Sequence, residues 1–209
     1  MNPETLRRTR RSALLALAAV GASTALTGCA GLLVGGAVGG ALVAADRRTS
    51  GAQLEDQGIE LKAELRLRET LGSRAHVNVT SYNRLVLITG EAPTAEDRAA
   101  VEQLVSRLDN VRSIVNELAV MGNSSLTARS SDAIVTAQVK GRFIDAKDVQ
   151  ASAIKVVTER GVVQLMGRVT EKEAARAAEI ARGAPGVQKV VRVFEIITEA
   201  ELARLQKGG

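Results

Sequence analysis

The chain has 209 residues, enough for one or two small domains, and its content of 45% apolar and 24% charged residues is typical of a globular protein. Aromatic side chains are limited to one Tyr and two Phe, with no Trp. The cores must therefore be aliphatic, and the lack of aromatic platforms argues against a nucleic-acid-binding module that stacks bases.

The net charge of +5 is unevenly distributed. Residues 56–121 hold 8 basic and 10 acidic side chains, a net of −2, whereas residues 132–198 hold 11 basic and 8 acidic side chains, a net of +3. A basic second half favours an anionic partner such as a membrane surface. A solvated face without a partner explains a charge of this size equally well.

The first 28 residues have the features of a secretory signal peptide. Four arginines precede an apolar run from Ala13 to Leu26, and small residues follow it. The run ends in Leu-Thr-Gly-Cys at the only cysteine, Cys29, which excludes an intramolecular disulfide. This sequence resembles the bacterial lipobox, which implies that Cys29 is acylated and becomes the first residue of the mature protein. The alternative is a buried or incidental thiol.

The residue after the cysteine is Ala30. In lipoproteins of this kind an Asp there implies retention in the inner membrane, so Ala30 implies the outer membrane of a Gram-negative host. Residues 31–45 are rich in glycine and repeat small residues four apart, as close helix pairs in lipid do. The segment is shorter than the ~20 residues of a spanning helix, so it either lies against the bilayer or forms a flexible tether. Residues 49–57 are polar and are predicted to be extended.

One pattern occurs twice in the rest of the chain. Two β-type runs joined by a polar turn end at Gly90 in the first copy and at Gly167 in the second, 77 residues later. The starts of the paired runs, Val77 and Ile154, are also 77 residues apart. A fixed period over this distance indicates a duplicated domain.

Each copy is predicted to run helix, strand, strand, helix, strand. Apolar residues four apart mark one face of each first helix: Ile59, Ala63 and Leu67, then Val135, Val139 and Phe143. Asp56 and Asp132 precede these faces and are the predicted N-caps. Side chains alternate between the two faces of a strand, so one set in each second strand is predicted to face the core. These sets are Val86, Ile88 and Gly90 in the first copy and Val163, Leu165 and Gly167 in the second. The order fits an α+β fold in which helices pack on a three-stranded sheet.

The two copies resemble the BON domain. They share with it a strand that ends in Val-x-Leu-x-Gly or a close variant, and a late Gly-Val before the last strand. The segment Asp46-Arg47-Arg48-Thr49, together with the lipobox, resembles the division- and outer-membrane-stress-associated lipid-binding lipoprotein family. That resemblance implies a non-enzymatic, lipid-anchored protein of the outer membrane that faces the periplasm. It also implies that the second domain binds anionic phospholipid, that the protein supports envelope integrity, and that it has links to outer-membrane assembly machinery.

The predicted organisation has six segments. They are a signal peptide (1–28), a lipidated tether (29–55), a first BON domain (56–121), a linker (122–131), a second BON domain (132–198) and a tail (199–209).

The family places lipid contact on the first helix of the second domain. With Val135, Val139 and Phe143 turned inward, a rotation of 100° per residue exposes the opposite side. The predicted lipid-binding residues there and on the flank are Ile134, Ala137, Lys140, Gly141, Arg142 and Ile144. Isoleucines beside cations suit insertion at the boundary between headgroups and acyl chains. The first helix of the first copy has Leu61 and Leu65 at the equivalent outward positions. An apolar outward face of this kind could therefore instead pack on the other domain.

The sequence indicates no catalytic residues, no metal site and no cofactor or small-molecule substrate. The single histidine, His76, lacks the neighbours of a metal site or a catalytic triad and is predicted to be a strand-edge residue. The glycine-rich segment 31–45 lacks the Gly-Lys-Ser/Thr of a phosphate-binding loop. Beside a lipid-binding module, the sequence leaves open a protein-interaction adaptor for outer-membrane assembly or division factors.

Overall fold

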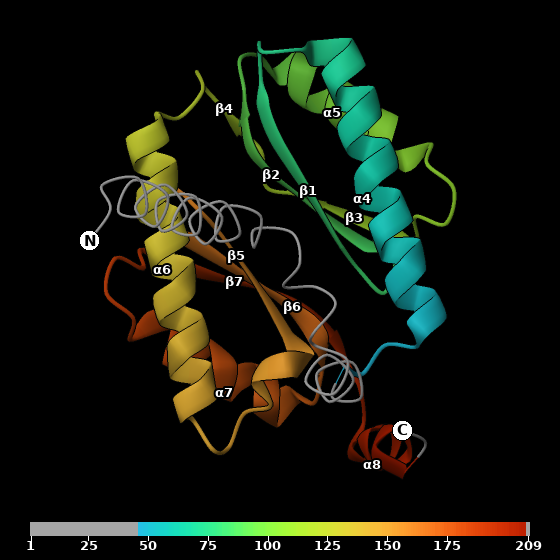
Figure 1. Cartoon of the computed structure of the whole chain (residues 1–209), viewed down its shortest axis with the longest axis vertical. Helices are drawn as coiled ribbons and strands as arrows, with labels where there is room; N and C mark the ends of the chain where they lie inside the picture. Colours follow the sequence, from blue (N-terminus) through green and yellow to red (C-terminus); the bar gives the residue numbers. More distant parts are fainter. Residues whose placement is uncertain (1–45, 208–209) are drawn as a thin grey trace, which may run out of the picture. The chain divides into compact units, whose positions relative to one another are not determined.

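The structure, a computed structural model, describes residues 46–207, in which one arrangement of elements occurs twice (Figure 1). The first copy consists of α4 (Ser50–Leu71), β1 (His76–Tyr82), β2 (Leu85–Ala92), α5 (Ala95–Ser106), β3 (Ser113–Asn116) and β4 (Ala119–Val120). The second consists of α6 (Leu126–Asp145), a 3₁₀ turn (Ala151–Ala153), β5 (Ile154–Glu159), β6 (Val162–Val169), α7 (Glu171–Arg182) and β7 (Lys189–Ile196). A final helix, α8 (Glu199–Lys207), occupies the predicted polar tail.

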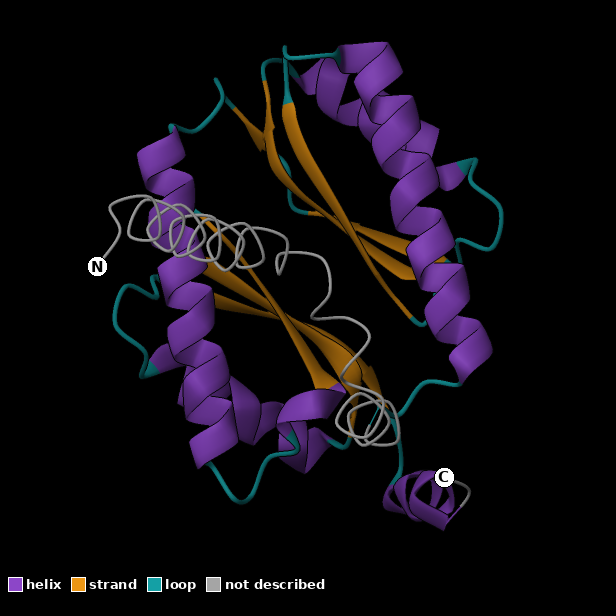
Figure 2. Ribbon diagram, in the orientation of Figure 1, coloured by secondary structure: helices purple, strands orange, loops and turns teal. Residues whose placement is uncertain are grey.

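Both sheets have the same topology. The central strand pairs antiparallel with the strand before it and parallel with the strand after α5 or α7, in the order β1-β2-β3 and β5-β6-β7. Helices lie against the strands of each copy (Figure 2). The predicted α+β fold, with helices on a three-stranded sheet, is confirmed. The last strand of the first copy is split into β3 and β4, because Leu118 turns into the core and its N–H bonds to Oδ1 of Asn116.

The predicted helix and strand faces form the two cores. One cluster joins α4, β2 and α5, and a second joins α6, β6 and α7. The clusters include the predicted residues Ile59, Ala63, Leu67, Val86 and Ile88, and Val135, Val139, Phe143, Val163 and Leu165. The second helices contribute Val101 and Val105 from α5, and Ala177 and Ala181 from α7. These faces are aliphatic except for Phe143, as the composition requires.

The predicted N-caps were wrong. Helix α4 begins after Thr49, whose hydroxyl accepts from Ala52 N–H, and α6 begins after Ser125, whose hydroxyl accepts from Ala128 N–H. The prediction that residues 49–57 are extended was therefore also wrong, and residues 126–131 of the predicted linker are helical. A hydroxyl-bearing N-cap satisfies a free N–H of the first turn, so both helices extend further toward the N-terminus than their apolar faces indicate.

Asp56 and Asp132 are buried inside these helices, where each holds a hairpin turn. Asp132 accepts hydrogen bonds from the N–H groups of Arg160 and Gly161, both at 2.8 Å. Asp56 accepts the equivalent bonds from Asn83 and Arg84 at 2.7 and 2.8 Å. All four turn residues have positive φ, between 50° and 70°, as two-residue hairpin loops with right-handed twist require.

The two copies join through the faces of their sheets that are turned away from the helices. Tyr82 and Leu87 from the first sheet pack with Met166 and Val193 from the second in a third apolar cluster. Leu87 and Met166 are fully buried. The sheets are therefore covered on both sides, which explains why the central strands β2 and β6 are buried along almost their whole length.

Candidate functional site

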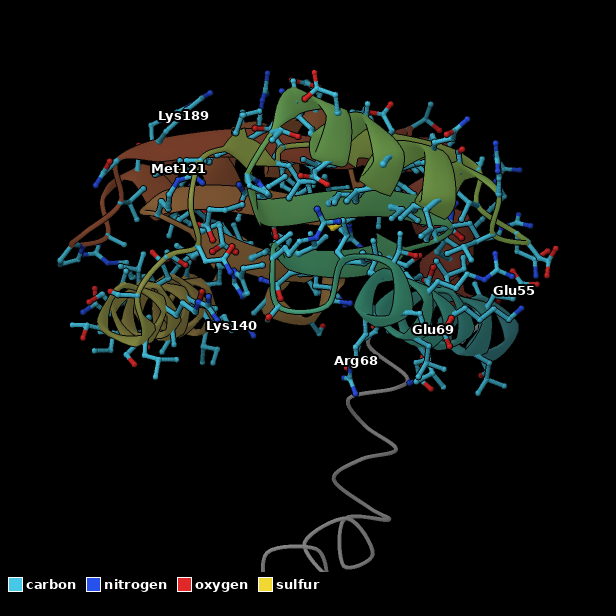
Figure 3. All side chains as sticks on the ribbon, turned by 90° about the horizontal axis from the view of Figure 1, so that it is seen from above. Glu55, Arg68, Glu69, Met121, Lys140 and Lys189 are labelled. Atoms are coloured by element: carbon cyan, nitrogen blue, oxygen red, sulfur yellow. The ribbon has the colours of Figure 1, made fainter. Side chains whose placement is uncertain are left out.

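The predicted lipid-binding residues lie on the exposed side of α6. The side chains of Ile134 and Ile144 are 59% and 74% exposed. Ala137 and Lys140 are exposed between them, and Gly141 is half-buried. The structure thus brings these five residues onto one side of α6, and Figure 3 shows Lys140 at the surface of this helix. No helix among residues 46–207 is both long enough and apolar enough to cross a bilayer.

Arg142 is exposed on the flank of α6. Its guanidinium lies beside Gly183 at the end of α7, and with Asp145 and Arg176 it lines a shallow depression between the two helices. Among the described residues, neither Lys140 nor Arg142 forms an ion pair through its side chain, although the Arg142 carbonyl accepts the N–H that ends α6. Two cations that have no acidic partner within residues 46–207 therefore flank the exposed isoleucines.

The matching side of α4 differs from α6 in its charges. Leu61 and Leu65 are 58% and 50% exposed, so neither packs on the other domain. Arg68, seen at the surface of α4 in Figure 3, pairs with Glu64, and Lys62 lies 3.4 Å from Asp109. Lys62 and Arg68 are thus paired with acids, whereas Arg66, next to Leu65, forms no ion pair through its side chain among the described residues. The two helices share an apolar stripe, but α4 carries Glu64 at the position that Lys140 occupies in α6.

The segment that precedes α4 is fixed to the second domain. Arg47 is buried, and its guanidinium donates to both carboxylate oxygens of Glu173 at 2.6 and 2.8 Å and to the carbonyl of Arg168 at 2.8 Å. Burial alone would raise the pKa of Glu173, but the hydrogen bonds from Arg47 and Thr170 outweigh burial and lower it. Periodicity could not identify this contact because it links positions 126 residues apart.

The next residue, Arg48, connects the same segment to the first domain. Its guanidinium binds Asp46 and Asp56 and stacks over the Tyr82 ring, 4.3 Å from the ring centre. Burial and the charge of Asp46 raise the pKa of Tyr82 to about 12, although Arg48 and Arg47 oppose this shift. The Asp46-Arg47-Arg48 sequence therefore has a structural role, which is to dock the chain on both domains.

His76 begins the edge strand β1, as predicted, but it also has acidic neighbours. Its Nδ1 lies 3.2 Å from Oε2 of Glu91 and 3.9 Å from Oε1 of Glu159, which comes from the second domain. Burial raises the pKa of Glu159, and the hydrogen bond from Asn78 only partly offsets this effect. Alternation along β1 carried a signal for this arrangement, because His76 and Asn78 share the face opposite to Val77.

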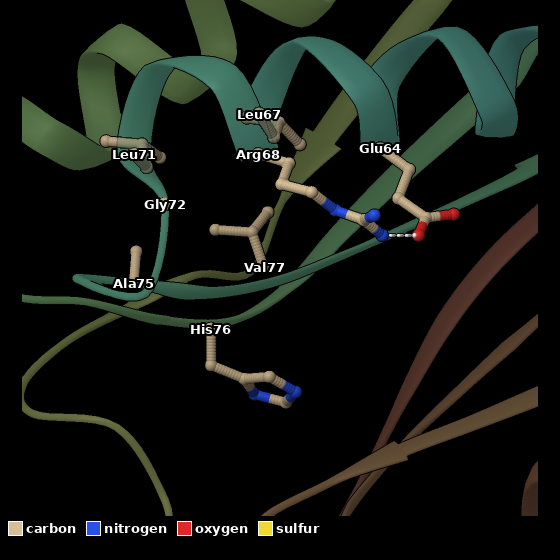
Figure 4. A pocket seen from close by; sticks show the side chains of 8 residues that line it. All are labelled: Glu64, Leu67, Arg68, Leu71, Gly72, Ala75, His76 and Val77. Carbon is tan, nitrogen blue, oxygen red and sulfur yellow. Dashed lines mark hydrogen bonds and ion pairs between the residues drawn. The ribbon is translucent and has the colours of Figure 1, made fainter.

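A pocket of about 210 Å³ lies beside His76, between the end of α4 and the start of β1. Its lining residues include Leu67, Leu71 and Val77 (Figure 4). The His76 ring lies on the opposite side of β1 from Val77, so the imidazole is directed away from the apolar lining. The pocket contains no grouping of nucleophile and base, and its apolar walls belong to the first core.

Comparisons with known proteins agree with the fold. The BON domain model matches residues 58–122 and 131–198. The chain is 36% identical to the outer membrane lipoprotein DolP of Haemophilus influenzae over 85% of this chain and 93% of that protein. It is 32% identical to a 21 kDa hemolysin of Actinobacillus pleuropneumoniae over 73% of this chain and 79% of that protein.

Among solved structures, CdsD, a structural protein of the type III secretion system of Chlamydia trachomatis, aligns over 69% of this chain and 96% of the solved chain. The identity is 10% and the TM-score 0.28, too low to support an inference. The matches that carry weight are therefore those of sequence.

Proposed function

The chain belongs to the BON-domain family, with two copies of the domain, and from this premise we propose that it is a non-enzymatic lipoprotein that binds anionic phospholipid through α6. The lipid anchor at Cys29 holds the protein in the outer membrane, facing the periplasm, where it supports membrane integrity. The printed name of its H. influenzae relative, an outer membrane lipoprotein, supports this location. Cys29 and the signal peptide lie outside the described residues.

The observation that carries the proposal is the combination of exposed isoleucines and unpaired cations on α6. Burying an isoleucine side chain in the interfacial region contributes about 1.5–3 kcal/mol, and a Lys or Arg near an anionic surface contributes about 1 kcal/mol. Either kind of contact alone gives weak binding, so Ile134 and Ile144 act together with Lys140 and Arg142. Helix α4, which carries Glu64 at the position of Lys140, serves as the internal comparison.

Liposome co-sedimentation tests this assignment with residues 46–209, which contain all three apolar clusters and lack the acylated cysteine. Vesicles of phosphatidylglycerol are expected to bind the wild type, and Ile134→Asp and Lys140→Glu are each expected to weaken binding about tenfold or more. Binding of the wild type weakens with added salt, because part of the attraction is electrostatic.

Matched control variants come from the first domain. Leu61→Asp and Lys62→Glu change an exposed leucine and a lysine of α4 in the same way and are expected to leave binding unchanged. Equal binding by all five proteins would contradict the assignment to α6. Loss of binding by the α4 variants as well would extend the lipid-binding surface to both domains.

The exposed leucines of α4 favour a second candidate, a protein-interaction adaptor for outer-membrane assembly or division factors. Leu54, Leu61 and Leu65 are between 50% and 69% exposed, and the nearby Lys62 and Arg68 are paired with acids, which suits a protein partner better than an anionic membrane. A stoichiometric partner that co-purifies with the Lys140→Glu variant but not with Leu61→Asp would support this function.

A further inference from the structure

We propose that His76, Glu91 and Glu159 form a binding site for a divalent transition-metal cation, such as Zn²⁺, that links the two domains. The candidate ligand atoms of the three side chains all lie within 4.8 Å of one another. Two of them, His76 and Glu91, are cross-strand partners on β1 and β2 of the first domain. The third, Glu159, ends β5 of the second domain.

The ligand types suit this class of cation. One imidazole nitrogen and two carboxylates form a set that Zn²⁺ accepts, whereas Mg²⁺ and Ca²⁺ prefer oxygen ligands alone. Ligand atoms around tetrahedral Zn²⁺ stand roughly 3.3 Å apart. The distance of 3.2 Å from His76 Nδ1 to Glu91 Oε2 meets this spacing, and the distance of 3.9 Å to Glu159 Oε1 closes with a small side-chain rotation.

The site is buried, and hydrogen bonds from neighbouring residues orient its ligands. The Glu91 side chain is fully buried, and those of Glu159 and His76 are 7% and 19% exposed. The N–H and hydroxyl of Ser124 both donate to Oε2 of Glu91, and the amide of Asn78 donates to Oε2 of Glu159 at 3.1 Å. Such outer contacts hold metal ligands in position.

An unpartnered hydroxyl lies on the same surface. Thr89 shares with Glu91 the face of β2 that is turned away from the helices, and its cross-strand partner is Asn78. Its Oγ1 is buried and has no hydrogen-bond partner among the described residues. Three protein ligands leave a fourth position of Zn²⁺ for a water molecule.

The surroundings provide both charge balance and access. Arg160 approaches Oε1 of Glu91 at 3.5 Å and the carbonyl oxygen of Gly90 at 3.4 Å. Both contacts are long, so the Glu91 oxygen Oε1 is still able to bind a cation. A groove of about 470 Å³ between the domains is lined by Asn78 and Glu159, among others, and opens a path to the site.

Isothermal titration of the full chain in detergent, with no affinity tag, tests the proposal with ZnCl₂. One ion per chain is expected, and the wild type is expected to melt several degrees higher with Zn²⁺ than with a chelator, because the ion binds only the folded state. Glu159→Gln is expected to abolish the saturable site, and Asn78→Ala to weaken it about 10–100-fold.

The control variant is Glu60→Gln, which removes another carboxylate that spans the domains, the one paired with Lys155, and leaves the three ligands intact. It is expected to retain the site. The melting shift of the wild type needs no variant, so a folding defect cannot obscure the outcome. A wild type that shows no saturable binding and no melting shift with Zn²⁺ would overturn the proposal and leave the three side chains as an ion-free network.

Discussion

The central strands each carry a glycine two residues before their end, Gly90 in β2 and Gly167 in β6, and both lie against the backbone of the preceding segment. A Cβ on Gly90, which has a φ of +109°, would stand 2.0 Å from the carbonyl oxygen of His76. A Cβ on Gly167 would stand 2.3 Å from that of Ala153. Both copies therefore require the absence of a side chain at this point.

Gly90→Ala is expected to lower the free energy of unfolding by about 3 kcal/mol, because the new methyl group meets a backbone atom that cannot move aside. Gly58→Ala is the matched control, since a Cβ at this helical position meets nothing within 4 Å. It is expected to raise stability by about 0.5–1 kcal/mol. Urea denaturation of both variants measures the difference, and a Gly90→Ala protein as stable as the wild type would contradict the close approach.

At the scale of elements, each hairpin depends on an aspartate in the helix before it. The carboxylate of Asp132 satisfies two turn N–H groups that the strands cannot satisfy. Because both turns have left-handed backbone, the helix–turn contact holds a conformation that non-glycine residues such as Arg160 and Asn83 seldom adopt.

Asp132→Ala removes both acceptors and is expected to destabilise the chain by about 2–3 kcal/mol, the range for losing hydrogen bonds to a charged group. Asp145→Ala, at the exposed end of the same helix, is expected to change stability by less than about 0.5 kcal/mol. Thermal unfolding followed by circular dichroism distinguishes them. Equal stability of the two variants would show that the turn does not need its carboxylate.

Helices and strands could be located from the sequence wherever a regular pattern of apolar residues marks the side that packs into a core. The faces of α4 and α6 repeat every four residues, and the central strands alternate, so both were correctly predicted. The starts of the helices were misjudged because Thr49 and Ser125 cap them about two turns before the predicted caps, Asp56 and Asp132. Local patterns also could not identify the contacts of Arg47 or the grouping of His76 with Glu159, since these residues meet only after the domains have packed.

At the scale of the whole molecule, ion pairs near the molecular surface supplement the apolar contact between the sheets. Glu195 of the second domain accepts from Asn83 at 2.7 Å and from Arg112 at 2.9 Å. Burial would raise the pKa of Glu195, but these hydrogen bonds outweigh burial and lower it. Glu173, bound by Arg47, has a lowered pKa for the same kind of reason.

Because the pKa values of Glu173 and Glu195 are lowered in the folded state, the stability of the fold decreases as the pH falls. A carboxyl group with a lower pKa in the folded state adds stability above its unfolded pKa, about 4.3 for Glu, and this stability is lost as the pH falls through the folded pKa. The urea midpoint of the wild type is therefore expected to fall as the pH is lowered from about 5 to about 3.

The double variant Glu173→Gln/Glu195→Gln is expected to start from a lower midpoint at neutral pH and to lose less of it on acidification. Glu96→Gln, which replaces an exposed glutamate, provides the control. Parallel curves for the wild type and the double variant would show that these two carboxylates do not link folding to protonation.

The docking of Arg47 also sets the greatest distance between Cys29 and the folded domains. Because the chain is fixed to the body from residue 46 onward, only about 17 residues separate it from Cys29, and they span roughly 60 Å at most when fully extended. If Cys29 is acylated and α6 binds lipid as proposed, its encounter with headgroups is intramolecular, at an effective concentration on the order of millimolar. Weak binding to free vesicles would then be enough to keep α6 on the membrane, and inserting residues between Cys29 and Asp46 would reduce its occupancy without altering a contact of α6.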